Sequence, residues 1–229
     1  MNPVVRAQLK AFVRANPKPQ AKESELFEIF SIFAICNGYL TDNIDPFTVH
    51  LEGTDFGIDG VAIMVQGILC QNTDETAAAL ENGKNHEVEF NLFQAKTSES
   101  IDYGDLSKFF DGAYNFFTGK FVDASDQLMD LMAAKDFIYQ AALKRNPKLR
   151  LFFVSTGSGE ISKPIQQLID SSNSRFQGLS IFESIEIHVI GAKELQSGYR
   201  SATNSIASSI EINKPITLPE HKSVQQASR

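Results

Sequence analysis

The pattern of apolar and polar positions changes period along this chain, and it is densest in residues 22–40. There, KESELFEIFSIFAICNGYL carries apolar side chains on most faces of a helical period. Such density predicts a largely buried helix that ends near Asn37-Gly38. Residues 4–14 are only weakly periodic, and the breaker NPKP at 16–19 separates them from this helix. We therefore set residues 1–20 apart as an N-terminal arm.

Short segments with strand character come next. FTVHLEG at 47–53 is a candidate first strand, and VAIMVQG with ILCQ predicts a hairpin around Gly67. The polar stretch 72–87 predicts a loop. Residues 86–98, HEVEFNLFQAKTS, alternate with a period of two and predict a further strand.

The second half of the chain alternates between helices and strands. We expect helices at roughly 102–118 and 124–145, the second ending in basic residues that complement its dipole. LRLFFVSTG at 149–157 is a continuous apolar run, typical of a buried parallel strand. A helix at 162–176, a strand at 184–191 and a helix from Ala192 complete the order. The sequence thus predicts an α/β domain over 21–212 with a mixed sheet flanked by helices. Residues 213–229 resemble a linker to a C-terminal region.

Charge and cysteine usage narrow the function classes. The net charge of −7 and the pI of 5.1 count against broad non-specific binding of nucleic acid, although a local basic stripe is compatible with them. Cys36 and Cys70 lie in apolar segments without metal-ligand spacing, which favours reduced, buried thiols. No apolar run reaches the ~20 residues of a membrane span. We expect a cytoplasmic protein with no membrane partner.

One set of residues carries candidate chemistry. Asp59 lies where a glycine-bearing turn enters a strand, and Gln94 and Lys96 share one face near the end of another strand, with Ala95 on the opposite face. If the two strands are neighbours, the three side chains converge at one sheet edge. Mg²⁺ prefers hard oxygen ligands, and a lysine nearby can stabilise a phosphodiester transition state.

These residues also resemble a known family. Glu28 in a helix, the turn Gly57-Ile58-Asp59-Gly60 and the QxK run 94–96 resemble the PD-(D/E)xK nuclease superfamily, in its Mrr-type restriction branch. LFE at 26–28, TDFGIDGVAI at 54–63 and FQAK at 93–96 look most like the N-terminal region of AIPR proteins, which are linked to abortive phage infection. The resemblance covers roughly residues 20–160.

The resemblance implies a restriction-endonuclease-like αβββαβ core and a Mg²⁺-dependent endodeoxyribonuclease, with Mn²⁺ as a substitute metal. By position, Asp59, Gln94, the Ala95 carbonyl and Glu28 would hold the metal, and Lys96 would be the catalytic lysine. DNA is the implied partner, a homodimer is compatible with the family, and phage defence is the implied role. The neutral Gln94 also supports an alternative, an inactive nuclease-fold module that binds nucleic acid or a protein.

Several assignments stay open at this point. Glu25 competes with Glu28 as the helical carboxylate, and Asp55 is either an outer ligand or, as we favour, a turn cap. His50 is expected to be structural. The run STGSGE at 155–160 lacks the GK[ST] ending of a phosphate loop. The basic stretch 144–150 is explained equally well as a DNA contact and as a solvated helix end.

Overall fold

The computed structural model describes residues 1–40, 44–53, 56–81, 87–121, 124–141 and 143–206. Five strands form one sheet: β1 (Gly60–Val65), β2 (Ile68–Cys70), β3 (Val88–Ala95), β4 (Lys148–Val154) and β5 (Ser184–Ile190). The helices are α1 (Pro3–Ala15), α2 (Glu23–Tyr39), α3 (Pro46–Val49), α4 (Thr73–Glu81), α5 (Tyr103–Thr118), α6 (Asp126–Gln140), α7 (Lys163–Gln177) and α8 (Ala192–Ile206).

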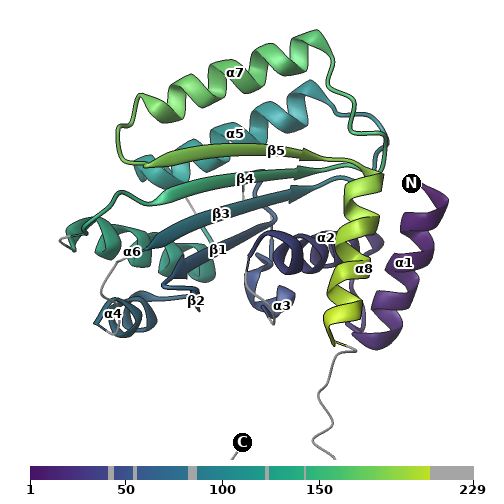
Figure 1. Cartoon of the computed structure of the whole chain (residues 1–229), viewed down its shortest axis with the longest axis horizontal. Coiled ribbons are helices and arrows are strands. Elements are labelled where there is room, and N and C mark those ends of the chain that lie inside the picture. The colour runs from purple at the N-terminus through teal and green to yellow at the C-terminus, as the bar shows by residue number, and fades with distance from the viewer. Residues whose placement is uncertain (41–43, 54–55, 82–86, 122–123, 142, 207–229) are drawn as a thin grey trace, which may run out of the picture.

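The sheet is mixed, and its order is β2-β1-β3-β4-β5. β1 runs antiparallel to both β2 and β3, whereas β3, β4 and β5 are mutually parallel. The hairpin predicted around Gly67 is confirmed. Gln66 and Gly67 both have positive φ angles, 56° and 78°, as in the turns that match strand twist. The predicted α/β class with a mixed sheet flanked by helices is therefore correct (Figure 1).

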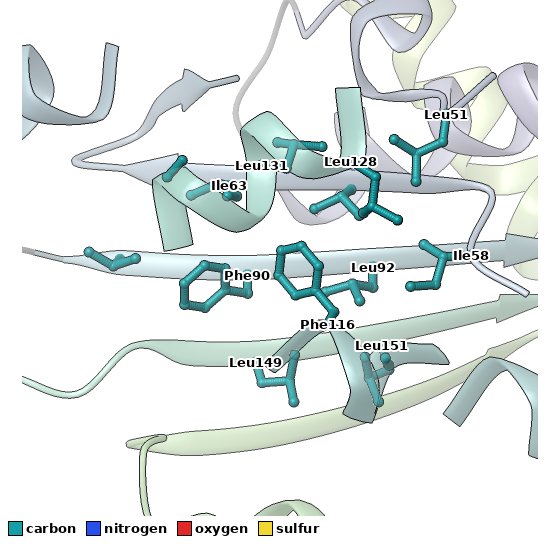
Figure 2. Packing of buried hydrophobic residues seen from close by; sticks show 14 of the residues in the cluster. Leu51, Ile58, Ile63, Phe90, Leu92, Phe116, Leu128, Leu131, Leu149 and Leu151 are labelled. Atoms are coloured by element: carbon teal, nitrogen blue, oxygen red, sulfur yellow. The ribbon is translucent and has the colours of Figure 1, made fainter. Parts of the chain in front are cut away.

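Two hydrophobic clusters cover the two faces of the sheet. On one face, alternate residues of β1, β3 and β4 pack with α5, α6 and α7 in a cluster that includes Phe90, Leu92 and Leu151 (Figure 2). On the other face, Phe93, Ala95 and neighbouring strand residues pack with α1, α2 and α8. β3 and β4 are buried on both faces over most of their length, which explains the continuous apolar run 151–154 in β4. Glu89, Asn91 and Gln94 interrupt the apolar pattern of β3.

Residues 1–20, set apart as an arm by the sequence, include the helix α1. Its side chains Val5, Leu9 and Phe12 are buried in the second cluster, and the helix lies beside α2 and α8 (Figure 1). Asn2 caps it by accepting hydrogen bonds from the N–H groups of Val4 and Val5.

Three local predictions are wrong. The candidate strand 47–53 is instead the short helix α3, which Asp45 caps and Pro46 begins, followed by a single bridge from His50 to Gly60. The polar stretch 72–87 contains α4. Asn72 and Glu75 cap this helix reciprocally: Asn72 accepts from the N–H of Glu75, whose carboxylate accepts from the N–H of Gln71.

The third error concerns the end of α6. The helix stops at Gln140, and no basic residue lies in its last turn, so the basic residues from 144 onward do not complement its dipole. The expected linker at residues 213–229 lies outside the described residues, as do Asp55 and residues 82–86. Among the residues that the structure describes, no helix is long and apolar enough to cross a membrane.

Candidate functional site

Glycines bring the start of β1 into close contact with α2. A Cβ atom on Gly60 would lie 2.7 Å from Cδ1 of Ile32 and 3.0 Å from the carbonyl oxygen of Val49. Gly57 has a φ of +85°, which L side chains rarely adopt. The GxDG pattern thus serves two needs, a left-handed turn and a close approach of α2, and both place Asp59 at the sheet edge.

Asp59 is held by its backbone and by its carboxylate. Its N–H donates to the carbonyl of Phe93 at 2.8 Å, and its carbonyl accepts from the N–H of Leu51 at 3.0 Å. The carboxylate oxygen Oδ2 accepts from the N–H of Ala95 at 2.7 Å. The side chain therefore continues the ladder between β1 and β3 past the last strand residue, and it ties the GxDG turn to the QxK run.

The surroundings of Asp59 disfavour its charged form. Burial, followed by the nearby carboxylate of Glu28, raises its pKa from 3.8 to about 7, against the opposing effects of the Ala95 N–H, Lys96 and His50. Two carboxyl groups and one lysine thus lie within electrostatic reach of one another at the end of β1. A cation bound there would offset the cost of the paired negative charges.

The helical carboxylate nearest Asp59 is Glu28. Its Oε2 lies 3.0 Å from Nε2 of His50, whose side chain is only 3% exposed. Glu25 points elsewhere and forms an ion pair with Lys18 at 2.8 Å. The two alternatives from the sequence are thus separated by their partners: Glu28 acts on the pKa of Asp59, and Glu25 is neutralised by Lys18.

Gln94 lies one residue beyond the strand pair Gly60–Phe93, opposite Asp59. Ala95 packs in the cluster on the α2 side, so alternation along β3 directs Gln94 to the face of α5 and α6. Its Oε1 is buried and has no hydrogen-bond partner among the described residues. A buried amide oxygen without a donor is unusual, and it is the type of ligand that Mg²⁺ accepts.

The candidate side chains approach the strand ends from two faces. Glu28 and His50 come from the α2 side, Gln94 comes from the α5 side, and Asp59 lies between them at the edge of β3. Lys96 directly follows β3, where its N–H donates to the carbonyl of Val154 at 2.8 Å. Among the described residues, no group of three His, Cys, Asp or Glu side chains gathers as a metal cage. The available donor set is two carboxylates, one amide and the Ala95 carbonyl.

The loop STGSGE after β4 has a structural use. The hydroxyl of Thr156 donates to the carbonyls of Thr97 and Ser98, and its N–H also donates to Ser98. These bonds fasten the segment that follows Lys96 to the end of β4. Ser155 beside it is fully buried, and its Oγ has no partner among the described residues. Sequence reasoning missed Ser155, since nothing in a serine after a strand predicts burial.

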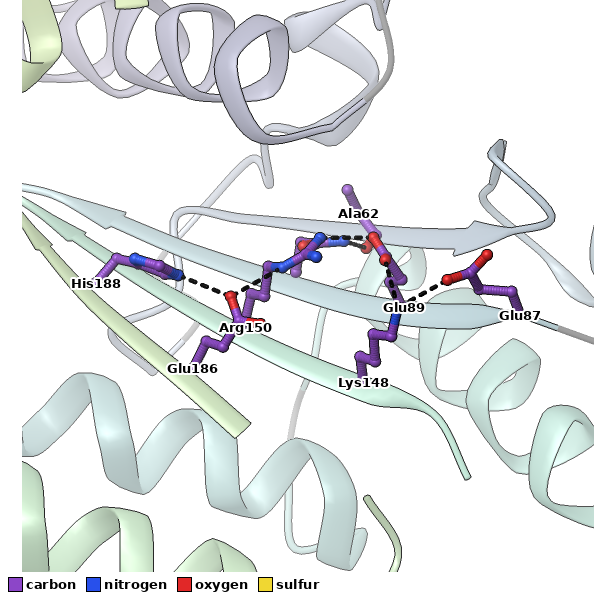
Figure 3. Close-up of polar contacts among 8 residues, drawn as sticks. Ala62, Glu87, Glu89, Lys148, Arg150, Glu186 and His188 are labelled. Carbon is purple, nitrogen blue, oxygen red and sulfur yellow. Dashed lines mark hydrogen bonds and ion pairs between the residues drawn. The ribbon is translucent and has the colours of Figure 1, made fainter. Parts of the chain in front are cut away.

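The basic stretch 144–150 is partly neutralised. Lys148 pairs with Glu87 at 2.7 Å, and Arg150 pairs with Glu89 at 2.7 Å and with Glu186 at 3.2 Å (Figure 3). These contacts run across β3, β4 and β5 and continue to His188. Phosphate contact by Lys148 or Arg150 would have to compete with these carboxylates.

Sequence reasoning also missed the link between His50 and Glu28. The two residues are 22 positions apart, and only the packing of α2 against the start of β1 brings them together.

A scan of protein-family models, a search of curated proteins and a search of solved structures each found no match for this chain.

Proposed function

We propose that this chain is a metal-dependent nuclease domain that hydrolyses DNA phosphodiester bonds. The observation that carries the proposal is the Asp59 carboxylate, anchored on the Ala95 N–H and within electrostatic reach of Glu28 and Lys96. The unpartnered amide oxygen of Gln94 on the adjoining strand supports it. The order α2–β1–β2–β3–α5–β4 is compatible with the αβββαβ core of restriction-type nucleases, with α3, α4 and α6 as additions.

The donors at the strand ends are of the kind that a hard divalent cation prefers. Asp59 and the Ala95 carbonyl would hold the cation, joined by Gln94 from the α5 side or by the carboxylate of Glu28 from the α2 side. Such a cation, when bound, offsets the charge that develops on the phosphate and lowers the pKa of water. His50 orients Glu28, as histidine–carboxylate pairs do around metal sites. The Lys96 ammonium would donate to a phosphate oxygen and stabilise the charge of the transition state.

Cleavage of plasmid DNA tests the proposal. We expect Mg²⁺- or Mn²⁺-dependent nicking by the wild type, and a loss of at least about 100-fold in Lys96→Ala and Asp59→Ala, the scale of removing one group that stabilises a transition state. Lys163→Ala is the matched control, because this lysine is exposed on α7. Equal cleavage by the wild type and Lys96→Ala, or no cleavage with either metal, would overturn the catalytic proposal.

A second candidate is a nuclease-fold module that binds nucleic acid or a partner without hydrolysis. The neutral Gln94 in place of a carboxylate and the contact of Glu28 with His50 favour it. Titration of Mn²⁺ by calorimetry separates the candidates. A catalytic site takes up Mn²⁺ in a way that depends on Asp59, and a binding module does not. Phage defence is the role that the resemblance to AIPR proteins adds to the first candidate.

A further inference from the structure

The basic residues of this acidic chain are unevenly distributed. Residues 1–22 hold five of the 21 Lys and Arg residues and none of the 28 Asp and Glu residues. The five are spaced four apart: Arg6, Lys10, Arg14, Lys18 and Lys22. Residues 1–22 therefore carry a local charge of +5, although the whole chain carries a net charge of −7.

Three of these residues form a stripe along α1, hereafter the α1 stripe: Arg6, Lys10 and Arg14. Residues four apart lie on one face of a helix, and the stripe spans about 12 Å at a rise of about 1.5 Å per residue. All three are exposed, and no ion pair to an acidic side chain is recorded for them among the described residues. The opposite face of α1 is buried in the second hydrophobic cluster, so the stripe faces outward.

The α1 stripe borders a groove of about 540 Å³ between α1 and the start of α2. Leu9, Val13 and Leu26 form its floor, and Glu23 is its one acidic lining residue. The apolar floor suits the long stems of arginine and lysine, which cover apolar surface while their charged ends reach solvent. The groove thus supports the basic side chains at the surface.

The stripe leads toward the candidate site. Lys18, four residues beyond Arg14, contacts Glu25 at 2.8 Å and Glu52 at 3.1 Å. Glu25 is three residues before Glu28 on α2, and Glu52 is two residues after His50. An extended ligand lying along α1 would therefore reach the part of α2 that carries Glu28 and the segment that follows His50.

We infer that the α1 stripe binds the phosphate backbone of DNA, an inference that rests on the proposed nuclease function. One strand of a duplex carries a phosphate every ~3.4 Å of axis, so the stripe spans about three phosphates. Unpaired arginine and lysine bind phosphate strongly, whereas Lys148 and Arg150 on the sheet are already paired with carboxylates. A contact of this kind positions the duplex and reads no sequence.

Fluorescence anisotropy with a short labelled DNA duplex tests the inference, with EDTA present to prevent cleavage. The variant Arg6→Gln/Lys10→Gln/Arg14→Gln should bind at least about tenfold more weakly than the wild type. The slope of log affinity against log salt concentration should fall by about 2 to 3, since each lost phosphate contact removes ~0.9. The charge-conserving variant Arg6→Lys/Lys10→Arg/Arg14→Lys should retain binding.

Lys120→Gln/Lys163→Gln/Lys193→Gln is the control, because these three lysines are also exposed. Equal losses in the two triple variants, no loss in the stripe variant, or no DNA binding by the wild type would each overturn the inference. Binding to phosphatidylserine vesicles in place of DNA would also overturn it, in favour of a membrane surface. Melting temperatures show that the variants fold.

Cleavage assays on the same proteins separate the two proposals. If DNA binding depends on the α1 stripe but no metal supports cleavage, the proposed hydrolysis is wrong and the inference about the α1 stripe is supported. If cleavage depends on Lys96 but DNA binding is unchanged in the stripe variant, the inference about the α1 stripe is wrong and the proposed hydrolysis is supported.

Discussion

The carboxylate of Asp59 accepts a hydrogen bond from the N–H of Ala95 at 2.7 Å, across the end of the β1–β3 ladder. This one contact joins the two sequence motifs, GxDG and QxK. Their distance from each other in space could not be read from the sequence. It also stabilises a carboxylate whose other surroundings, burial and Glu28, work against its charge.

We predict that Asp59→Asn stabilises the metal-free protein, increasingly so as the pH rises from about 4 to 7. Asp59 has a pKa of about 7 when folded, against an ordinary value of 3.8, so the wild type loses stability as the pH rises between these values. One pKa unit corresponds to about 1.4 kcal/mol, and partial burial reduces the effect, so we expect a gain of about 2 kcal/mol at pH 8.

Urea unfolding with EDTA at pH 4.5 and pH 8 measures this difference. The amide of Asn can still accept from the Ala95 N–H, so the variant keeps the ladder contact. A stability gain that is the same at both pH values would contradict the assigned pKa.

A second prediction concerns metal binding. Mn²⁺ should raise the melting temperature of the wild type, because a ligand at 100 times its Kd stabilises a protein by about 2.7 kcal/mol. Asp59→Ala should abolish the shift, and Glu160→Gln, which removes an exposed carboxylate after β4, should keep it. Differential scanning fluorimetry over a Mn²⁺ series provides the measurement. A shift that survives in Asp59→Ala would place the metal elsewhere.

Two glycine substitutions should act in opposite directions. Gly60→Ala places a Cβ atom 2.7 Å from Ile32, and we expect a loss of about 1–3 kcal/mol in unfolding free energy, typical of overpacking. Gly38→Ala, in α2, meets nothing within 4 Å and should add about 0.5–1 kcal/mol through helix propensity. Chemical denaturation of the pair provides the test. Equal effects would mean that α2 does not pack on β1 as described.

The two cysteines should be unreactive in the folded protein. Burial raises the pKa of the Cys36 thiol to about 12, and it also raises that of Cys70. The thiolate, which is the reactive form, is therefore scarce at pH 8. Iodoacetamide followed by mass spectrometry should find neither thiol modified under native conditions and both modified in urea. Rapid native modification of Cys36 would require α2 to open.

Hydrophobic period predicted the strands and long helices well, because β3, β4, α2 and α8 carry patterns that burial on one or two faces requires. The hydrophobic period failed to predict two short helices whose start is determined by capping residues. Asp45-Pro46 begins the helix α3 in a segment whose composition favours a strand, and Asn72 with Glu75 caps α4 in a segment that is merely polar. Both capping patterns involve polar residues next to the helix start, so the spacing of apolar positions does not reveal them.

The candidate site was predictable in part. The turn at Asp59 and the alternation at Gln94 and Lys96 put these residues near the ends of two strands, and their convergence depended on those strands being neighbours. The pairing of Gly60 with Phe93 meets that condition. The contact between Glu28 and His50 was not predictable, since it depends on how closely α2 approaches β1. It was also not predictable that Glu28 and Gln94 approach the strand ends from opposite faces, because the sequence does not show which helix covers each side of the sheet.

The ion pairs across β3, β4 and β5 have a consequence for folding accuracy. Parallel strands are joined by long crossovers, so no tight turn determines how they align, unlike the β1–β2 hairpin. On the partly exposed surface of these strands, Arg150 lies between Glu89 and Glu186, and Lys148 lies beside Glu87. A strand displaced by one residue would bury these charges against the apolar layer of α5 and α7. The ladder thus penalises misaligned sheets, and it keeps the ends of β3 and β4 level where Lys96 and Ser155 follow.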